Sequence, residues 1–214
     1  MARTPTAERR DARHPDHLLD IRAALAYLDK EYSIGQDYIL MGHSAGATLT
    51  YQLLMGDAAL AGQVAMPVSL PRAAIGISGI YDLNGLVRRF EGVHGGIYRN
   101  FVTGAFGSDE ELWKTVSPVN NPSKYIWPGV ALAMLAWSPD DTMIDEPEID
   151  CMMRKLEADG AHLTVVKDLN GDHEVVWEQG QQIVRLVAEA IEHIDRDSDV
   201  FILSSTKFSS TKEG

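Results

Sequence analysis

The chain has 214 residues, of which 45% are hydrophobic, so it is long enough to form one domain with a sizeable core. Its formal net charge of −12 argues against nucleic acid and anionic membranes as partners, because both repel an acidic surface. The single cysteine, Cys151, excludes an internal disulfide and is typical of a reducing compartment, so we expect a cytoplasmic protein. No apolar run approaches the ~20 residues of a membrane-spanning helix. No His and Cys cluster has metal-ligand spacing, so we expect neither a metal nor a cofactor.

The N-terminal part of the chain predicts a flexible segment, a helix and a short strand. Residues 1–13 are polar and are expected to be flexible. A helix is predicted to begin at His14, with Pro15 in its first turn. Residues 38–41 are apolar and predict a strand.

A Gly-x-Ser-x-Gly motif, Gly42 to Gly46, follows that strand and precedes a helix expected over about 45–55. In this context the motif is typical of a nucleophile elbow, in which Ser44 stands clear of the backbone at a sharp turn. Positions 42 and 46 are expected to require very small residues, because strand and helix nearly touch there. The backbone N–H of Ala45 would then point toward a developing oxyanion. The alternative is a tight turn used only for packing, and His43 is interpreted as a packing residue of the elbow that points away from the nucleophile.

The rest of the chain alternates strands with helices, which predicts a parallel sheet flanked by helices, an α/β fold. Residues 83–127 predict a substrate-covering, cap-like insertion rich in glycine and aromatic residues. Tyr81, Trp113 and Trp127 are candidate walls of a substrate pocket, although an ordinary core aromatic is the favoured interpretation of each. Besides the elbow strand, we expect strands at 72–78, 130–137 and 163–166, which makes four strands in all. Helices are expected at 147–159 and 183–194, and a tail at 195–214.

Two residues are expected to complete a catalytic triad with Ser44. In folds with this elbow the partners follow in the order Ser, acid, His, each in a loop after a strand. Asp141 follows the strand at 130–137, and His173 follows the strand at 163–166. His173 would take the Ser44 proton, and Asp141 would fix its tautomer. Asp140 and Asp145 compete for the acid role, and Asp172-His173 could instead be a plain turn before a helix.

These motifs resemble the hormone-sensitive-lipase-like branch of α/β-hydrolases, and within it the fungal kynurenine formamidases (arylformamidases). The elbow is generic, whereas the stretch Ser78-Gly79-Ile80-Tyr81-Asp82-Leu83 is more discriminating; Asp141 to Asp145, Ser117-Pro118 and Gly171 to His173 also match. The resemblance covers about residues 13–194, within which we expect a partial α/β-hydrolase domain at 14–194. It implies hydrolysis of N-formyl-L-kynurenine to L-kynurenine and formate, within tryptophan degradation toward NAD.

The chain departs from this family in one respect. Members carry a His-Gly-Gly-x-Trp motif before the elbow, whose N–H groups complete the oxyanion hole, and no such motif precedes Ser44. His94-Gly95-Gly96-Ile97-Tyr98 has similar letters but follows the elbow, so a glycine-rich cap loop is the better interpretation. The resemblance therefore predicts an N-terminally truncated domain with four of the usual ~8 strands. The elbow strand would become an edge, open to pairing with another chain, for example in a homodimer.

Two other functions stay open. A carboxylesterase of the same branch would use the same residues on an ester. A truncated, inactive remnant or binding module would keep the residues without the activity.

Overall fold

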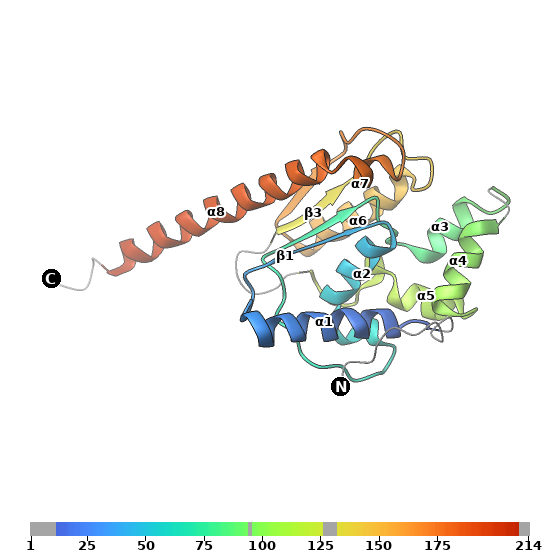
Figure 1. Ribbon diagram of the computed structural model, residues 1–214, viewed down its shortest axis with the longest axis horizontal. Helices are drawn as coiled ribbons and strands as arrows, with labels where there is room; N and C mark the ends of the chain where they lie inside the picture. Colours follow the sequence, from blue (N-terminus) through green and yellow to red (C-terminus); the bar gives the residue numbers. More distant parts are fainter. Residues whose placement is uncertain (1–11, 94–95, 126–131, 210–214) are drawn as a thin grey trace.

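The computed structural model describes residues 12–93, 96–125 and 132–209. They form a four-stranded parallel sheet in the order β1-β2-β3-β4 (Figure 1), which confirms the predicted α/β class and strand number. The strands are β1 (Ile39–His43), β2 (Ala73–Ile77), β3 (Leu132–Ala136) and β4 (Leu163–Val166).

All four strands end at the same edge of the sheet. In the register of the ladders, His43 lies opposite Ile77, Ile77 opposite Ala136, and Ala136 opposite Val166. The loops that follow β1, β3 and β4 therefore begin side by side. This is the edge at which open parallel sheets place ligand-contacting residues.

Helices cover both faces of the sheet. The first face carries α1 (Asp16–Tyr32), α2 (Ala45–Leu54) and α6 (Glu146–Asp159), which pack with Leu135 and Ala74 in one core cluster. The second face carries α8 (Gln181–Ser209), preceded by α7 (Val175–Gln179), and its core includes Met134 and Leu186. A 3-10 helix at Gly56–Leu60 follows α2. Among the described residues, no helix is long and apolar enough to cross a membrane.

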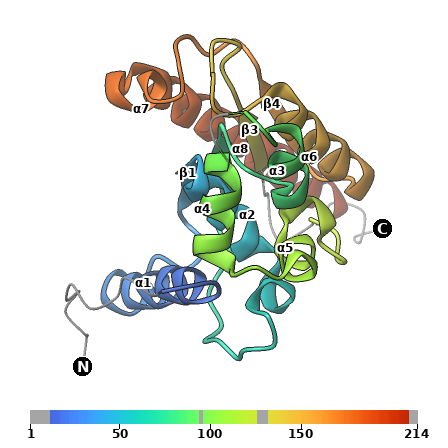
Figure 2. The same cartoon turned by 90° about the vertical axis from the view of Figure 1, so that its right-hand side faces the viewer.

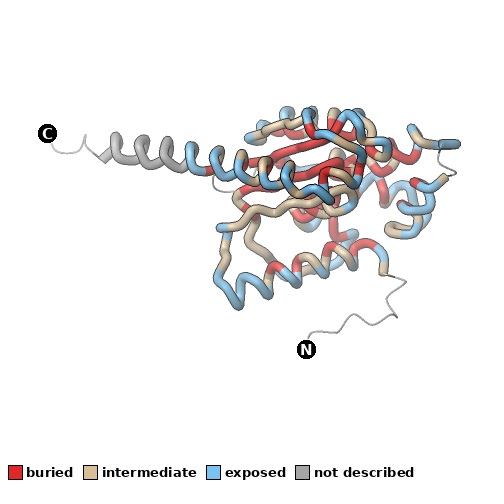
Figure 3. The backbone as a smooth tube through the Cα atoms, turned by 45° about the horizontal axis from the view of Figure 1, so that its top comes forward, coloured by how far each residue is buried: buried red, intermediate tan, exposed pale blue. Residues whose placement is uncertain are grey.

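The central strands are fully buried, but the elbow strand is not. Every residue of β2 and β3 is buried, as the apolar sequence of these strands predicts, whereas all five residues of β1 are only half-buried (Figure 3). The difference arises because β1 pairs with β2 alone and forms an edge of the described sheet. The predicted edge position of the elbow strand is thus confirmed.

The C-terminal segment differs from the prediction. We expect a tail from residue 195, but α8 continues to Ser209 and projects beyond the sheet (Figure 1). Residues 195–209 contain neither glycine nor proline, so no residue in this stretch interrupts the helix. Residues 210–214, and residues 1–11 of the expected flexible segment, lie outside the described residues.

The insertion at 83–127 forms a separate helical layer beside the strand ends. It contains α3 (Leu83–Arg89), α4 (Ile97–Phe106), α5 (Glu110–Val116) and a 3-10 turn at Pro118–Asn120. These helices share their own apolar cluster, which includes Leu86, Val102 and Trp113. Figure 2 shows α3, α4 and α5 on the side of the molecule where α2 begins.

A buried carboxylate and a partly exposed arginine fasten α3 to the sheet layer. The Glu148 carboxylate, on α6, is fully buried and accepts hydrogen bonds from the backbone N–H groups of Tyr81 and Asp82, at 2.6 and 2.9 Å. Arg89, the last residue of α3, pairs with Glu148 and donates to both Asp145 oxygens, at 2.6 and 3.0 Å. Burial raises the pKa of Glu148 to about 7, so without its cation this carboxylate would be costly to keep charged.

We expect Arg89→Met to lower the unfolding free energy by about 3 kcal/mol at pH 8, because it leaves a buried carboxylate without its partner. The pKa of Glu148 is higher in the folded protein than in the unfolded chain, so protonated Glu148 stabilises the fold at a pH below its ordinary pKa. This stabilisation is lost as the pH rises through the pKa of the folded protein. The deficit should therefore be smaller at pH 5, where Glu148 is neutral. Urea unfolding at both pH values measures this. Arg88→Met, at the exposed neighbouring position, is the control and should change stability by less than about 0.5 kcal/mol. Equal effects of the two variants would contradict the role given to the ion pair.

Candidate active site

The elbow places Ser44 at the junction of β1 and α2 in a strained conformation. Ser44 has φ 55° and ψ −124°, a region that residues with a side chain rarely adopt. Its N–H donates to Ile77 O at 2.9 Å, which fixes the turn against β2. Ala45 begins α2 and is exposed, so its backbone N–H lies at a helix N-terminus beside the Ser44 hydroxyl. A helix N-terminus favours a developing negative charge.

The two glycines of the elbow are not equivalent. A Cβ at Gly42 would lie 2.1 Å from the Gly46 carbonyl oxygen, so strand and helix do nearly touch at this point. A Cβ at Gly46, by contrast, would meet no described atom within 4 Å outside its own helix. The expected close approach of strand and helix is thus present, and it requires the absence of a Cβ at Gly42 but leaves room for one at Gly46.

The structure brings Asp141 and His173 together at the same edge of the sheet. His173 Nδ1 lies 3.1 and 2.9 Å from the two Asp141 oxygens, and both side chains are almost completely buried. The backbone N–H groups of Met143 and Ile144 each donate to Asp141 at 2.9 Å. This pairing leaves Nε2 as the free nitrogen of the His173 ring, the one suited to exchange a proton with a hydroxyl.

Burial alone would raise the pKa of Asp141, but the hydrogen bonds from His173 and from the Ile144 N–H outweigh it and hold the pKa below its ordinary value. Asp141 is therefore an anion at neutral pH and can stabilise a positive charge on His173.

The two competing acids have other partners. Asp140 accepts a hydrogen bond from the Gly171 N–H at 3.1 Å, and Asp145 pairs with Arg89. Asp172, beside His173, accepts from the N–H and hydroxyl of Thr142 at 2.9 and 2.8 Å. Of the three aspartates at 140, 141 and 145, Asp141 is the one that contacts His173.

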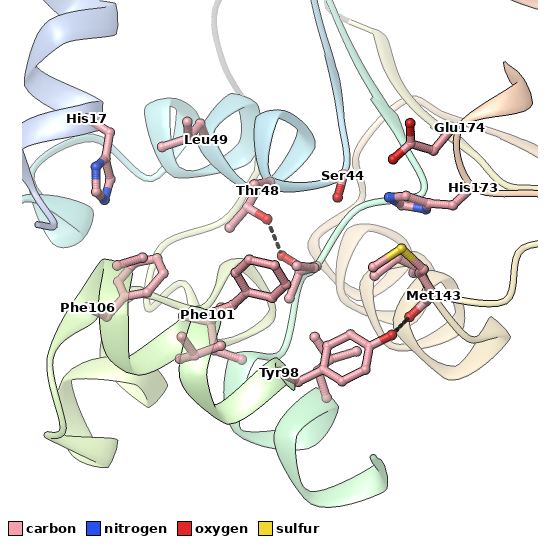
Figure 4. Close-up of a pocket in the computed structure, with 17 residues that line it drawn as sticks. His17, Ser44, Thr48, Leu49, Tyr98, Phe101, Phe106, Met143, His173 and Glu174 are labelled. Carbon is pink, nitrogen blue, oxygen red and sulfur yellow. Dashed lines mark hydrogen bonds between the residues drawn. The ribbon is translucent and has the colours of Figure 1, made fainter. Parts of the chain in front are cut away.

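Ser44 and His173 line a cavity of about 540 Å³ that opens between the sheet edge and the insertion. Figure 4 shows the Ser44 hydroxyl facing the His173 ring, with aromatic side chains across the cavity. Tyr98, Phe101 and Phe106, all on α4, form that aromatic wall, and the Tyr98 hydroxyl donates to Met143 O at 2.5 Å. The described lining contains one carboxylate, Glu174, and no lysine or arginine.

The residues expected to form the pocket wall lie elsewhere. Tyr81 is fully buried, and its ring occupies the space above two glycines: a Cβ at Gly76 would lie 2.3 Å from the Tyr81 hydroxyl oxygen. Trp113 is buried in the cluster of the insertion and donates its indole N–H to Gly107 O at 2.8 Å. Neither lines the cavity, so both are core aromatics, and the prediction that they contact substrate is not met. Trp127 lies outside the described residues.

His43 does not point away from the site, as the sequence had suggested. Its ring packs against the His173 ring, with centroids 4.5 Å apart, and its Nε2 lies 2.9 Å from His173 O. Sequence adjacency to Ser44 gave no sign of this contact, because His173 comes 130 residues later.

The remaining predictions concern metals and the glycine-rich loop. Within residues 12–93, 96–125 and 132–209, no group of three or more His, Cys, Asp or Glu side chains could hold a metal ion. His94 and Gly95 lie outside the described residues, and Gly96 precedes α4.

A parallel sheet with a strained serine after β1, and an aspartate and a histidine paired with each other after β3 and β4, defines an α/β-hydrolase fold. Solved structures agree. An esterase B from Lactobacillus rhamnosis matches with a TM-score of 0.67 and 13% identity, over 89% of this chain and 65% of that one. An esterase/lipase from an uncultured bacterium matches with a TM-score of 0.62 and 22% identity, over 86% and 62% of the two chains. At these identities the matches show the fold alone.

Sequence relatives narrow the class. A kynurenine formamidase of Aspergillus versicolor is 34% identical over 195 residues, 83% of this chain and 67% of the relative. A kynurenine formamidase-like hydrolase of Fusarium equiseti is 35% identical over 187 residues, 86% of this chain and 61% of the relative. No protein-family model matches. The chain belongs to the kynurenine formamidase family of α/β-hydrolases, and it spans 61–67% of the length of these relatives.

We expect Gly42→Ala to lower the unfolding free energy by about 1–3 kcal/mol, because the new methyl group meets backbone that cannot rotate away. Gly46→Ala is the matched control: it adds the same methyl group where space is open, in a helix that favours alanine by about 1 kcal/mol. Urea unfolding of both variants measures the difference. A Gly42→Ala protein as stable as the Gly46→Ala protein would rule out the close contact.

Proposed function

We propose that this chain is a serine hydrolase that cleaves N-formyl-L-kynurenine to L-kynurenine and formate, a step of tryptophan degradation toward NAD. The observation that carries the proposal is that Ser44 and His173 line one cavity, with Asp141 on the other nitrogen of the His173 ring, in a member of the kynurenine formamidase family. The substrate is a small molecule, and the reaction needs no cofactor. A cytoplasmic location belongs to the same proposal and rests on the lone Cys151.

In this mechanism His173 Nε2 takes the proton of the Ser44 hydroxyl as its oxygen attacks the formyl carbon. Asp141 stabilises the resulting imidazolium, and the N–H of Ala45 donates to the oxyanion. The C–N bond then breaks, and His173 returns the proton to the departing aryl amine, which leaves a formyl ester on Ser44. Water attacks that ester with His173 as base, formate leaves, and the Ser44 hydroxyl is restored.

The shape of the cavity supports a substrate with a small acyl group and an aromatic leaving group. A formyl group needs little room beside Ser44, and the rings of Tyr98 and Phe101 offer an apolar wall for an aryl amine. The Glu174 carboxylate, next to His173 in sequence, is the charged group available to an amino-acid ammonium.

A carboxylesterase is the second candidate, supported by the mostly apolar lining without lysine or arginine. Such a cavity would suit a neutral ester as well as it suits a formamide. The two functions are distinguished by measuring kcat/KM for N-formyl-L-kynurenine and for 4-nitrophenyl acetate. The ratio of the first value to the second should be much higher for a formamidase than for an esterase.

The test is hydrolysis of N-formyl-L-kynurenine by the purified chain, followed as kynurenine absorbance beside a Ser44→Ala control. We expect turnover that Ser44→Ala abolishes, and a fall in kcat of roughly 10³–10⁴-fold for Asp141→Asn, because the asparagine no longer holds the required His173 tautomer. Asp140→Asn is the control for Asp141→Asn, since Asp140 does not contact His173.

Turnover no greater than that of Ser44→Ala would overturn the proposal and favour an inactive remnant. A missing oxyanion donor lowers kcat by roughly 10²–10³-fold, so the assay must be sensitive enough to detect a kcat reduced by that factor.

A further inference from the structure

We propose that His43, the residue before the nucleophile, is a positioning residue that fixes the distance between His173 and Ser44, by donating a hydrogen bond to the main-chain carbonyl of His173 and packing on its ring. This inference rests on the proposed hydrolase function.

The first argument comes from how the His173 segment is held. This segment is Gly171 to His173, and its other side-chain bonds to the described chain join it to the acid loop: the Ser138 hydroxyl donates to Gly171 O at 2.6 Å, the Gly171 N–H donates to Asp140, and Thr142 donates to Asp172. The base and acid segments thus form one hydrogen-bonded unit. These contacts set the position of His173 relative to Asp141 but not relative to β1.

The second argument comes from the strand that carries the nucleophile. In the part of the chain that the structure describes, the bond from His43 Nε2 to His173 O, at 2.9 Å, is the one hydrogen bond between β1 and the His173 segment. His43 is the last residue of β1 and is covalently joined to Ser44. The bond therefore ties the acid-base unit to the residue adjoining the nucleophile.

The third argument concerns charge. A carbonyl only accepts, so His43 Nε2 must carry the proton of this bond. Burial, and then the neighbouring His173, lower the pKa of His43, and the carbonyl bond, Asp141 and Glu174 offset this only in part. His43 is therefore a neutral ring at neutral pH. A charged ring 4.5 Å from His173 would oppose the imidazolium that catalysis requires.

Two substitutions separate the hydrogen bond from general packing. The amide nitrogen of His43→Gln stands near the place of His43 Nε2 and can keep the bond, whereas the shorter side chain of His43→Asn cannot reach the carbonyl. We expect His43→Asn to lower kcat by about 10- to 100-fold with KM changed less than about twofold, and His43→Gln to stay within about threefold of wild type. Both N-formyl-L-kynurenine and 4-nitrophenyl acetate are used as substrates, and thermal unfolding checks that each variant folds.

A second measurement does not depend on turnover. In imidazole ¹H–¹⁵N spectra we expect the His173 signals to move in His43→Asn and to return in His43→Gln, while the Nδ1–H signal of the Asp141 bond persists in all proteins. Wild-type kcat and an unchanged His173 spectrum in folded His43→Asn would overturn the inference, as would equal impairment of the two variants. If the wild-type chain cleaves only the ester, the proposed substrate is wrong and the ester rates test His43. If it cleaves neither substrate, the proposed function fails and the spectra alone decide about His43.

Discussion

The close approach of β1 and α2 at Gly42 is the constraint on which the site depends. A Cβ at position 42 would lie 2.1 Å from the Gly46 carbonyl oxygen, so only glycine at this position allows the helix to start directly after the strand. The turn that results forces Ser44 to φ 55° and presents its hydroxyl above the sheet edge. The same turn places the first N–H of α2 directly after Ser44, so one steric contact determines both the conformation of this serine and the helix N-terminus that adjoins it.

The parallel register turns this local feature into a site. Because the strands end opposite one another, the loops after β3 and β4 emerge next to the elbow, and Asp141 and His173 meet although 32 residues separate them. The insertion then closes the other side of the cavity through α4. Its attachment relies on a buried carboxylate, Glu148, which links the turn after β2, α3 and α6. Ser44, Asp141 and His173 thus follow the ends of strands, and the aromatic wall of the cavity belongs to a helical layer that ionic contacts attach to the sheet.

Local sequence signals were enough to predict the strands, their parallel arrangement and the grouping of Ser44, Asp141 and His173, because each signal lies within a few residues of a strand end. The cavity wall could not be predicted in this way. Phe101 and Tyr98 face the site because α4 packs across it, which no short pattern encodes. Tyr81 is a core aromatic, the interpretation that the sequence favoured, because Gly76 and Gly79 leave room for its ring. The end of α8 was missed because a polar sequence suggested a tail while lacking any helix breaker.

The positive φ of Ser44 has a consequence for how the molecule tolerates change. Backbone strain of this kind costs of order 1–3 kcal/mol and is relieved by glycine, which adopts positive φ freely. In the proposed mechanism, the residue that reacts is thus one whose backbone strain makes the fold less stable. Random substitutions selected for thermal resistance alone would therefore tend to erase Ser44, and its retention in a lineage would require selection on chemistry and not on folding.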